Sequence, residues 1–288
     1  MNTQHSQAWI ITGASSGLGK SIALAALREG HSVIGTTRNP SPPAKDEFTE
    51  LGGTWLTLDV THPDTANTVA HVAQQHNIDV VVNCAGYAQL GAVEDVSDTE
   101  FHDQFEANVH GPLRILRGVL PVLRAKRSGV VVNISSGAGF TGRPGRGPYS
   151  ASKFALEGIS ESLFHELQPL GVRVLLVEPG AFRTPFSDSA QIPAAYAQGE
   201  GVSDGYKGTP AHEMVGLTKT MSSRSDLVKG DPDRAATAIV NAVLDHDFKA
   251  LRLPLGNDCI KAYEGKLQWM KDDLELTRAI ASATDYSP

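Results

Sequence analysis

Short runs of apolar and β-branched residues alternate along this chain with segments of helical periodicity. The runs that we expect to be strands span residues 9–12, 32–36, 54–58, 80–83, 130–134, 172–177 and 250–255. Most of these runs are apolar at successive positions, which is typical of strands buried on both faces of a parallel sheet. The alternation therefore predicts an α/β fold of the Rossmann type, a doubly wound parallel sheet with helices on both faces.

The segments between the runs carry apolar residues at spacings of three and four. One helix is expected from Phe105 to Leu123, and a second starts near Tyr149 with Leu156, Ile159, Leu163 and Leu167 on one stripe. Asp231-Pro232 has the form of an N-cap followed by proline at the first helical position, so a third helix is expected to begin there.

The chain of 288 residues is expected to form a single domain with two additions. Residues 185–229 are rich in Ala, Gly, Ser and Pro and have weak periodicity, so they are expected to form a substrate lid. A charged helical extension is expected at about 257–281, after the last strand.

Composition narrows the classes of function. The formal net charge of −7 argues against a nucleic-acid-binding protein, which usually carries a basic excess. The two cysteines, Cys84 and Cys259, have no metal-ligand spacing, and Cys84 lies in an apolar run as a packing residue would. The first residues lack the apolar core of a signal peptide, and no apolar run reaches the ~18 residues that span a membrane, so a soluble cytoplasmic protein is expected.

A glycine-rich loop follows the first expected strand. It reads Thr12-Gly13-Ala14-Ser15-Ser16-Gly17-Leu18-Gly19 and leads into a helix over Lys20–Arg28. Glycines allow the backbone to approach a pyrophosphate closely, and the free N–H groups of the helix N-terminus favour an anion. A glycine-rich turn without a ligand is the alternative, but the position between a first strand and a helix indicates a dinucleotide site.

The residues at the end of the second expected strand indicate which dinucleotide the protein binds. Dinucleotide-binding folds that use NAD place Asp or Glu there, about 20 residues after the glycine loop, on the ribose 2′-hydroxyl. Here the strand ends in Gly35-Thr36-Thr37-Arg38 and has no carboxylate. Thr37 can form a hydrogen bond and Arg38 can pair with a 2′-phosphate, so the sequence favours NADP(H) over NAD(H).

Tyr149 and Lys153 are four residues apart at the start of an expected helix, and this spacing puts both side chains on one face. An ammonium beside a phenol lowers the pKa of the phenol, which would prepare Tyr149 for proton transfer. The pair alone is weak evidence, since many helices contain it by chance. Asn133-Ile134-Ser135-Ser136 ends a strand upstream, however, and a serine at that edge of the sheet can donate to a carbonyl oxygen.

Together these motifs resemble the short-chain dehydrogenases/reductases, in their compact single-domain branch. The resemblance covers roughly residues 7–255. It also includes Asp59-Val60, Asn83-Cys84-Ala85-Gly86, Asn108, and Pro179-Gly180 followed by Thr184. The family usually has Asn where Cys84 stands. The stretches 150–158 and 177–186 are similar to those of hydroxysteroid- and retinol-dehydrogenase-like members.

The resemblance implies a role for each matching residue. The implied catalytic set is Tyr149 as acid/base, Lys153 as the cation that lowers its pKa and binds the nicotinamide ribose, Ser136 as the group that steadies the substrate oxygen, and Asn108 as the holder of a proton-relay water. The implied cofactor-binding residues are Gly13, Ser15, Ser16, Gly17, Leu18, Gly19, Thr37, Arg38, Asp59, Val60, Asn83, Ala85, Gly86, Tyr149, Lys153, Pro179, Gly180, Phe182 and Thr184.

These roles imply an NADP(H)-dependent oxidoreductase that moves a hydride between nicotinamide and an alcohol or carbonyl carbon, with reduction of a ketone or aldehyde expected in the cell. A non-catalytic NADP(H) sensor or scaffold on the same fold is the alternative. It predicts a damaged catalytic set, whereas Asn108, Ser136, Tyr149 and Lys153 are all present.

The substrate stays open at this stage among steroids, retinoids, polyketides and small aromatic carbonyl compounds. Seven apolar residues could line the lid or anchor it to the body: Phe182, Phe186, Ile192, Tyr196, Met214, Leu217 and Met221. An apolar lining would suit a hydrophobic small molecule. In many relatives the helices near Phe105 and Tyr149 form a dimer interface, so the resemblance implies a homodimer or homotetramer.

Overall fold

The computed structural model describes residues 6–39, 46–224 and 226–286, and these residues form a sheet of seven parallel strands. The strands run in the spatial order β3-β2-β1-β4-β5-β6-β7, so the order reverses between β1 and β4. This confirms the predicted Rossmann-type doubly wound fold. The strands are β1 Ala8–Ile11, β2 Ser32–Thr37, β3 Thr54–Thr57, β4 Val80–Asn83, β5 Val130–Ile134, β6 Arg173–Pro179 and β7 Arg252–Leu255.

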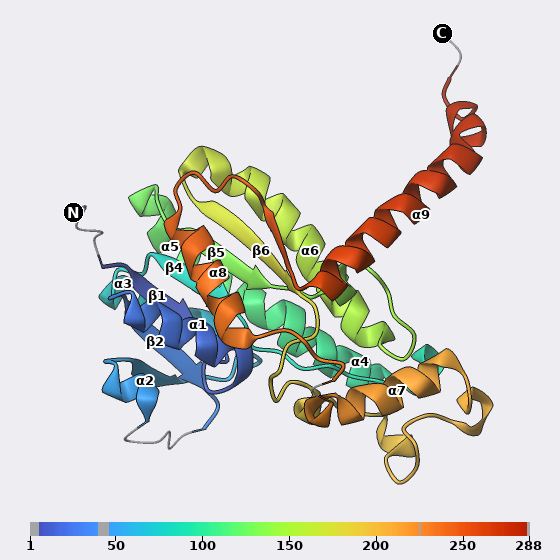
Figure 1. Ribbon diagram of the computed structural model, residues 1–288. Helices are drawn as coiled ribbons and strands as arrows, with labels where there is room; N and C mark the ends of the chain where they lie inside the picture. The colour runs from blue at the N-terminus through green and yellow to red at the C-terminus, as the bar shows by residue number, and fades with distance from the viewer. Residues whose placement is uncertain (1–5, 40–45, 225, 287–288) are drawn as a thin grey trace.

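Helices cover both faces of the sheet (Figure 1). On one face lie α1 Gly17–Arg28, α2 Glu47–Glu50 and α8 Pro232–Leu244, and on the other lie α3 Thr65–Gln75, α5 Gly111–Lys126 and α6 Gly147–Leu167. Successive strand residues are buried on opposite faces, because Trp9 and Ile11 pack under α1 and α8 whereas Ile10 packs under α3 and α5. This two-sided burial explains the continuous apolar runs in the sequence.

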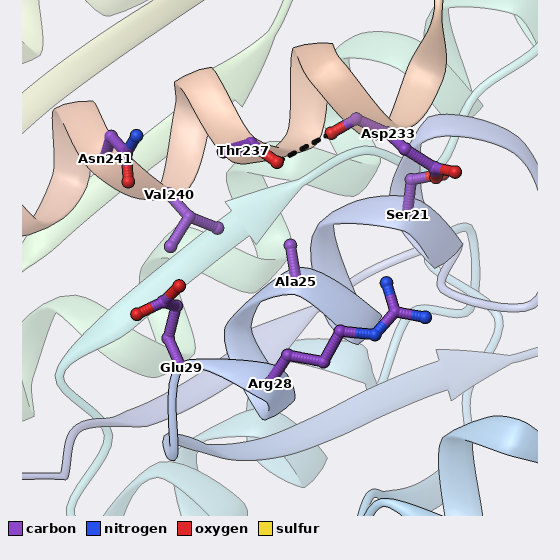
Figure 2. A pocket seen from close by; sticks show the side chains of 8 residues that line it. All are labelled: Ser21, Ala25, Arg28, Glu29, Asp233, Thr237, Val240 and Asn241. Atoms are coloured by element: carbon purple, nitrogen blue, oxygen red, sulfur yellow. Dashed lines mark hydrogen bonds between the residues drawn. The ribbon is translucent and has the colours of Figure 1, made fainter.

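Two helices far apart in the sequence, α1 and α8, pack side by side on their face of the sheet (Figure 2). The hydroxyl of Ser21 donates to the carboxylate of Asp233 at 2.8 Å, which joins the starts of the two helices. The small hollow between them, of about 110 Å³, has Ala25, Val240 and polar side chains in its wall. It holds none of the residues predicted to act on a ligand.

The helix predicted over 105–123 is longer than expected and has an irregular start. Helix α4, Asp98–Phe105, precedes a π-helical turn over Glu106–His110, and α5 then continues to Lys126. Ser97 caps α4 by accepting a hydrogen bond from the backbone N–H of Glu100, whose carboxylate in turn accepts from the backbone N–H of Ser97. This capping box was a sequence signal for the earlier start.

Two segments lie outside the regular layers. The segment over 185–229 contains short 3₁₀ turns and one helix that the sequence analysis did not expect, α7 Pro210–Thr220. The carboxyl-terminal helix α9, Asn257–Ser282, projects away from the sheet and its helices (Figure 1). Among the described residues, no helix is both long and apolar enough to cross a membrane.

Candidate active site

A cavity of about 1490 Å³ opens along the carboxyl ends of the parallel strands. Its wall includes the segments that follow β1, β4, β5 and β6, which is where ligands bind in sheets of this topology. All the predicted site residues except Asn83 and Asn108 lie in this wall. They are Gly13, Ser15, Ser16, Gly17, Leu18, Gly19, Thr37, Arg38, Asp59, Val60, Ala85, Gly86, Ser136, Tyr149, Lys153, Pro179, Gly180, Phe182 and Thr184.

The glycine loop needs glycine for two separate reasons. Gly13 has φ +68° and lies so close to the next strand that a Cβ there would be 2.9 Å from the Cα of Ala85. A Cβ on Gly19 would lie 2.4 Å from the carbonyl oxygen of Gly13. The loop is therefore folded tightly against the end of β4, with the N-terminus of α1 at the cavity wall, and this arrangement can hold a pyrophosphate.

Thr12, the first residue of the glycine-rich loop, ties the loop to the neighbouring strand end, a role that its place in the motif did not indicate. Its Oγ1 accepts hydrogen bonds from the backbone N–H groups of Cys84 at 2.9 Å and Ala85 at 3.1 Å. Burial raises the pKa of the Cys84 thiol to about 11. The thiol therefore stays protonated, as expected of a packing residue rather than a nucleophile.

The predicted adenosine end carries one exposed cation and one carboxylate. Arg38 is exposed just beyond β2, whereas the Thr37 hydroxyl accepts from the backbone N–H of Asn39 at 3.1 Å. Burial disfavours the charged form of Asp59, but hydrogen bonds from Thr61 and the charge of Arg38 outweigh it and lower the pKa of Asp59. The guanidinium of Arg38 thus lies near Asp59 at the cavity wall.

Two predicted site residues lie behind the wall. Asn83 is buried and donates to Asn133 at 2.9 Å, so it joins β4 to β5. Asn108, in the π-helical turn, donates to the carbonyl of Tyr87 at 3.1 Å and to the Ser152 hydroxyl at 3.0 Å. Because Ser152 donates in turn to the carbonyl oxygen of Tyr149 at 2.7 Å, Asn108 is linked to the helix that carries Tyr149 and Lys153.

Tyr149 and Ser136 meet in the cavity wall. The Ser136 hydroxyl is hydrogen-bonded to the phenol, and it also accepts from the backbone N–H of Ala138 at 3.1 Å. The ring of Tyr149 is almost fully buried and packs against Phe186, with 5.7 Å between the ring centroids. A phenol and a serine hydroxyl side by side can both bond to one carbonyl oxygen.

Lys153 lies one helical turn beyond Tyr149, as the spacing predicted. Its Nζ is 5.9 Å from the centroid of the Tyr149 ring and donates to the carbonyl oxygen of Ile134 at 2.8 Å. Burial lowers the pKa of this amine to about 8, although nearby Cys84 and Glu157 act in the opposite direction.

The expected depression of the tyrosine pKa is not found in this structure. Burial raises the pKa of Tyr149 above its ordinary value, and the groups that act against burial are Ser136, through its hydrogen bond, and Arg146, through its charge. Lys153 is not one of the groups that lower this pKa here. Tyr149 is therefore a neutral phenol over the ordinary pH range.

A network of charged groups lies behind Ser136 and Lys153. Arg252, on β7, forms ion pairs with Glu157 and Glu161 of α6 and with Glu178 of β6. Burial, together with the charge of Glu157, raises the pKa of Glu178. Tyr263 of α9 donates a hydrogen bond to Glu178.

The same network reaches the wall of the cavity. Ser135, the neighbour of Ser136, donates a hydrogen bond to Glu157. Glu157 lies one turn beyond Lys153 on α6, so the network fastens the helix that carries Tyr149 and Lys153 to two strands and to α9. No linear motif indicates this network, because its members are as many as 95 residues apart in the chain.

The lid contributes an apolar part of the wall. Five of the seven apolar residues considered for it lie in the cavity, namely Phe182, Phe186, Met214, Leu217 and Met221. Ile192 packs instead against a small core cluster under the lid, and Tyr196 is absent from the cavity wall. Among the residues that the structure describes, no group of three or more His, Cys, Asp or Glu side chains is arranged to hold a metal ion.

Comparison with known proteins gives the family. The model of the short chain dehydrogenase family matches residues 7–193. The chain is 48% identical over 192 residues to the oxidoreductase claN of Passalora fulva, covering 66% of this chain and 88% of claN. It is 33% identical over 288 residues to the oxidoreductase calM of Penicillium decumbens, covering 95% and 91% of the two chains.

A solved structure shows the same architecture over nearly the whole length. A short-chain dehydrogenase from Streptomyces avermitilis superposes with a TM-score of 0.82 at 37% identity, covering 98% of this chain and 100% of the other. The family model, the full-length relative and this superposition agree with the motifs at the strand ends. The chain belongs to the short-chain dehydrogenase family of oxidoreductases.

Proposed function

We propose that this protein uses NADPH to reduce the carbonyl group of a small molecule to an alcohol. The observation that carries the proposal is the buried, neutral phenol of Tyr149, hydrogen-bonded to Ser136 in the wall of the cavity that also contains the glycine loop. A neutral phenol can give a proton to a carbonyl oxygen, which is what reduction requires. The reverse reaction would need the phenolate, which burial disfavours here.

The residues at the strand ends fit a phosphorylated dinucleotide. The tight turn at Gly13 and Gly19 would bring backbone N–H groups to the pyrophosphate, and Arg38 would pair with a 2′-phosphate. Asp59 and Val60 would bind the adenine, and Lys153 the nicotinamide ribose. When bound, NADPH supplies the hydride. The absence of a carboxylate at the end of β2 supports NADPH over NADH.

In the proposed mechanism, Tyr149 and Ser136 act on the substrate oxygen. Both hydroxyls donate hydrogen bonds to it, and these bonds strengthen as the oxygen gains negative charge. Tyr149 then transfers its proton to the oxygen. The aromatic ring of Phe186 beside Tyr149 helps to exclude water from this end of the cavity. The proton-relay role expected for Asn108 stays a prediction, and its contacts with Ser152 support a role in positioning α6.

The proposal is tested by following NADPH absorbance with a panel of ketones, aldehydes and quinones. We expect Tyr149→Phe to lower turnover about 100- to 10,000-fold, the range of a lost general acid, while NADPH binding measured by fluorescence is retained. Tyr196→Phe, which changes a lid tyrosine outside the cavity wall, is the matched control. Undiminished turnover in Tyr149→Phe would refute the assignment. NADPH binding without turnover of any carbonyl class by the wild type would favour the non-catalytic sensor.

A further inference from the structure

Two arginines lie in the cavity wall without an acidic partner. Arg143 and Arg146 precede Tyr149 by six and three residues, and all three line the cavity. Among the described residues, no carboxylate lies within ion-pair distance of either guanidinium. Arg146 Nη2 donates to Thr218 Oγ1 at 2.7 Å and lies 3.5 Å from Met221 Sδ, but its Nε is buried and has no hydrogen-bond partner.

This arrangement is unfavourable for a guanidinium that stands alone. Burial lowers the pKa of Arg146, and although Tyr149 acts against this, the like charge of Arg143 lowers the pKa further. Arg146 is half-buried, and a charge partly removed from water without a counter-ion costs free energy, as does its buried Nε donor without an acceptor. An anion beside Arg146 would relieve both costs and would also meet the second cation.

We propose that Arg143 and Arg146 bind the carboxylate of the substrate, so that the protein reduces carbonyl compounds that join an apolar body to an acid group. Guanidinium groups match carboxylates in shape as well as charge. The apolar body has its own wall in Phe186, Met214 and Leu217 of the lid. The inference rests on the proposed carbonyl reduction and refines the expectation of a purely hydrophobic substrate.

The position of Arg146 also links substrate binding to the lid. Its side chain bonds to Thr218 and Met221, which lie in α7 and in the short turn that follows it. Its backbone N-caps α6, the helix that carries Tyr149. A carboxylate held by Arg146 is thus held between the lid and the proton donor.

The test uses pairs of oxo acids and their methyl esters, with kcat/KM measured by NADPH absorbance. We expect the wild type to prefer the acid of at least one apolar pair by about 10- to 100-fold, the range of one or two charge-assisted hydrogen bonds. Arg146→Gln and Arg143→Gln should each bring this ratio towards one, and Arg146→Lys should retain part of it. The matched control is Arg224→Gln, which changes a lid arginine that is outside the cavity wall and paired with Asp226.

The outcomes separate this inference from the proposed function. Tyr149-dependent turnover that is equal for acid and ester would overturn the carboxylate site and leave carbonyl reduction standing. An acid preference that survives both arginine substitutions would also overturn it. Absence of turnover with every acid, ester and simple ketone would refute the proposed function itself.

Helix α9 carries a second, independent inference. Its first turns are fastened to the body, because Cys259 is buried and the ring of Tyr263 stacks on Phe140 at 4.0 Å between centroids. Beyond this point the helix projects from the body (Figure 1). Its large apolar residues there are about half exposed or more, namely Leu267, Trp269, Met270, Leu274, Leu276 and Ile280.

The apolar residues on one side of α9 follow the spacing of a coiled coil. Ile260, Tyr263, Leu267, Met270 and Leu274 are separated by three, four, three and four residues, which places them at the a and d positions of heptads. The seam starts where the helix packs on the body and continues onto its unpartnered part. Most helical stability in proteins comes from packing of an apolar face against other elements, so such a seam indicates a helical partner.

Charges beside the seam point to a second copy in the antiparallel direction. If Leu267 lies opposite Met270 of the partner subunit, the flanking pairs join Lys266 to Asp273 of the partner subunit and Glu264 to Lys271 of the partner subunit. Both pairs are of opposite sign. In a parallel pair, Lys266 would instead face Lys271 of the partner subunit, and like charges there are unfavourable. We infer that α9 pairs with α9 of a second copy of this chain, with the two helices antiparallel.

The composition of α9 argues against an anionic membrane as the partner. The helix carries five acidic and four basic side chains, whereas segments that bind anionic lipids have an excess of Lys and Arg. A second copy supplies both the apolar seam and the opposite charges.

The test compares the particle mass of full-length variants by light scattering, with circular dichroism as the folding control. Leu267→Glu with Leu274→Glu should halve the mass of the wild-type assembly. The matched control, Leu276→Glu, changes a residue that is 80% exposed but outside the seam, and it should leave the mass unchanged. Lys266→Asp and Asp273→Lys should each weaken the assembly, and the double exchange should restore it.

A wild-type monomer, or a seam variant of unchanged mass, would overturn this second inference. Strengthening of the assembly by Lys266→Asp alone would overturn the antiparallel arrangement. If the protein co-sediments with phosphatidylserine vesicles and the seam substitutions abolish this co-sedimentation, the helix binds a membrane surface instead.

Discussion

Arg252 neutralises a pair of buried carboxylates, so its removal should destabilise the fold in a pH-dependent way. The side chain of Glu178 is fully buried and that of Glu157 is 7% exposed, and Arg252 forms an ion pair with each. Arg252→Met keeps much of the side-chain volume but leaves both carboxylates without their cation. Breaking a buried ion pair from one side costs about 3–5 kcal/mol, and we expect a loss of this size at about pH 8.

The sign of the pH dependence follows from Glu178. Its pKa is raised in the folded protein above the ordinary value of 4.5, so the folded state binds the proton more tightly than the unfolded chain. Stability therefore falls as the pH rises from the unfolded to the folded pKa. Arg252 is one of the groups that lower the pKa of Glu178, so this pKa should be still higher in Arg252→Met. The variant should therefore lose more stability at about pH 8 than at about pH 5.5.

The assay is urea unfolding followed by circular dichroism at both pH values, at one fixed protein concentration because association affects apparent stability. Arg28→Met is the control, because the pair of Arg28 with Glu47 is about half exposed on both sides and should contribute only about 0–1 kcal/mol. Adding Glu178→Gln to Arg252→Met should recover part of the loss. A loss below about 1 kcal/mol at pH 8, or an equal loss at both pH values, would refute this reasoning.

Three further substitutions test other parts of the site. Gly19→Ala puts a Cβ at 2.4 Å from the carbonyl oxygen of Gly13, so we expect NADPH affinity, measured by fluorescence titration, to fall at least about tenfold. Arg38→Ala should raise the KM for NADPH about 10- to 100-fold and leave that for NADH unchanged, and equal effects on both would contradict the 2′-phosphate assignment. The pKa of Lys153, the proposed ribose-binding amine, is about 8, and the charge of Glu157 raises it. Glu157→Gln should therefore lower this pKa and move the alkaline fall of kcat/KM to lower pH. A shift to higher pH would contradict this reasoning.

Much of the fold followed from local patterns. The apolar runs at 80–83 and 130–134 coincide with β4 and β5, because strands buried on both faces need apolar residues at every position. Helix α7 was missed, because Pro210–Thr220 lies in a stretch of small and polar residues and has a weak apolar stripe. Its buried residue Val215 packs in a cluster with Ala88, Leu90 and Tyr149, which lie far from it in the sequence.

The site was predictable only where a linear motif specifies it. The glycine loop, Ser136 and the Tyr149–Lys153 pair could be placed from their spacing. Arg146 could not, because its significance is that no carboxylate lies near it, and this depends on the packing of the lid. The shift in the pKa of Tyr149 was expected to be downward and is upward. Helical spacing shows that the amine of Lys153 lies near the phenol, but it does not show the burial that acts on both groups.

Helix α6 joins these features on one stripe. Arg146, Tyr149, Lys153 and Glu157 follow one another at spacings of three, four and four, so one helix face carries the proposed carboxylate-binding group, the proton donor, the ribose-binding amine and an anchor to the sheet. Glu157 and its partner Arg252 fix this face against β6 and β7, while Arg146 fixes its other end to the lid. A displacement of α6 along its axis would move all four groups together. Arg146 is the N-cap of α6 and Tyr149 lies in the first turn of that helix, so the proton donor and the proposed carboxylate site are held near one another. Substrates should therefore be selected by the separation of their carbonyl and acid groups more than by the shape of the apolar body between them.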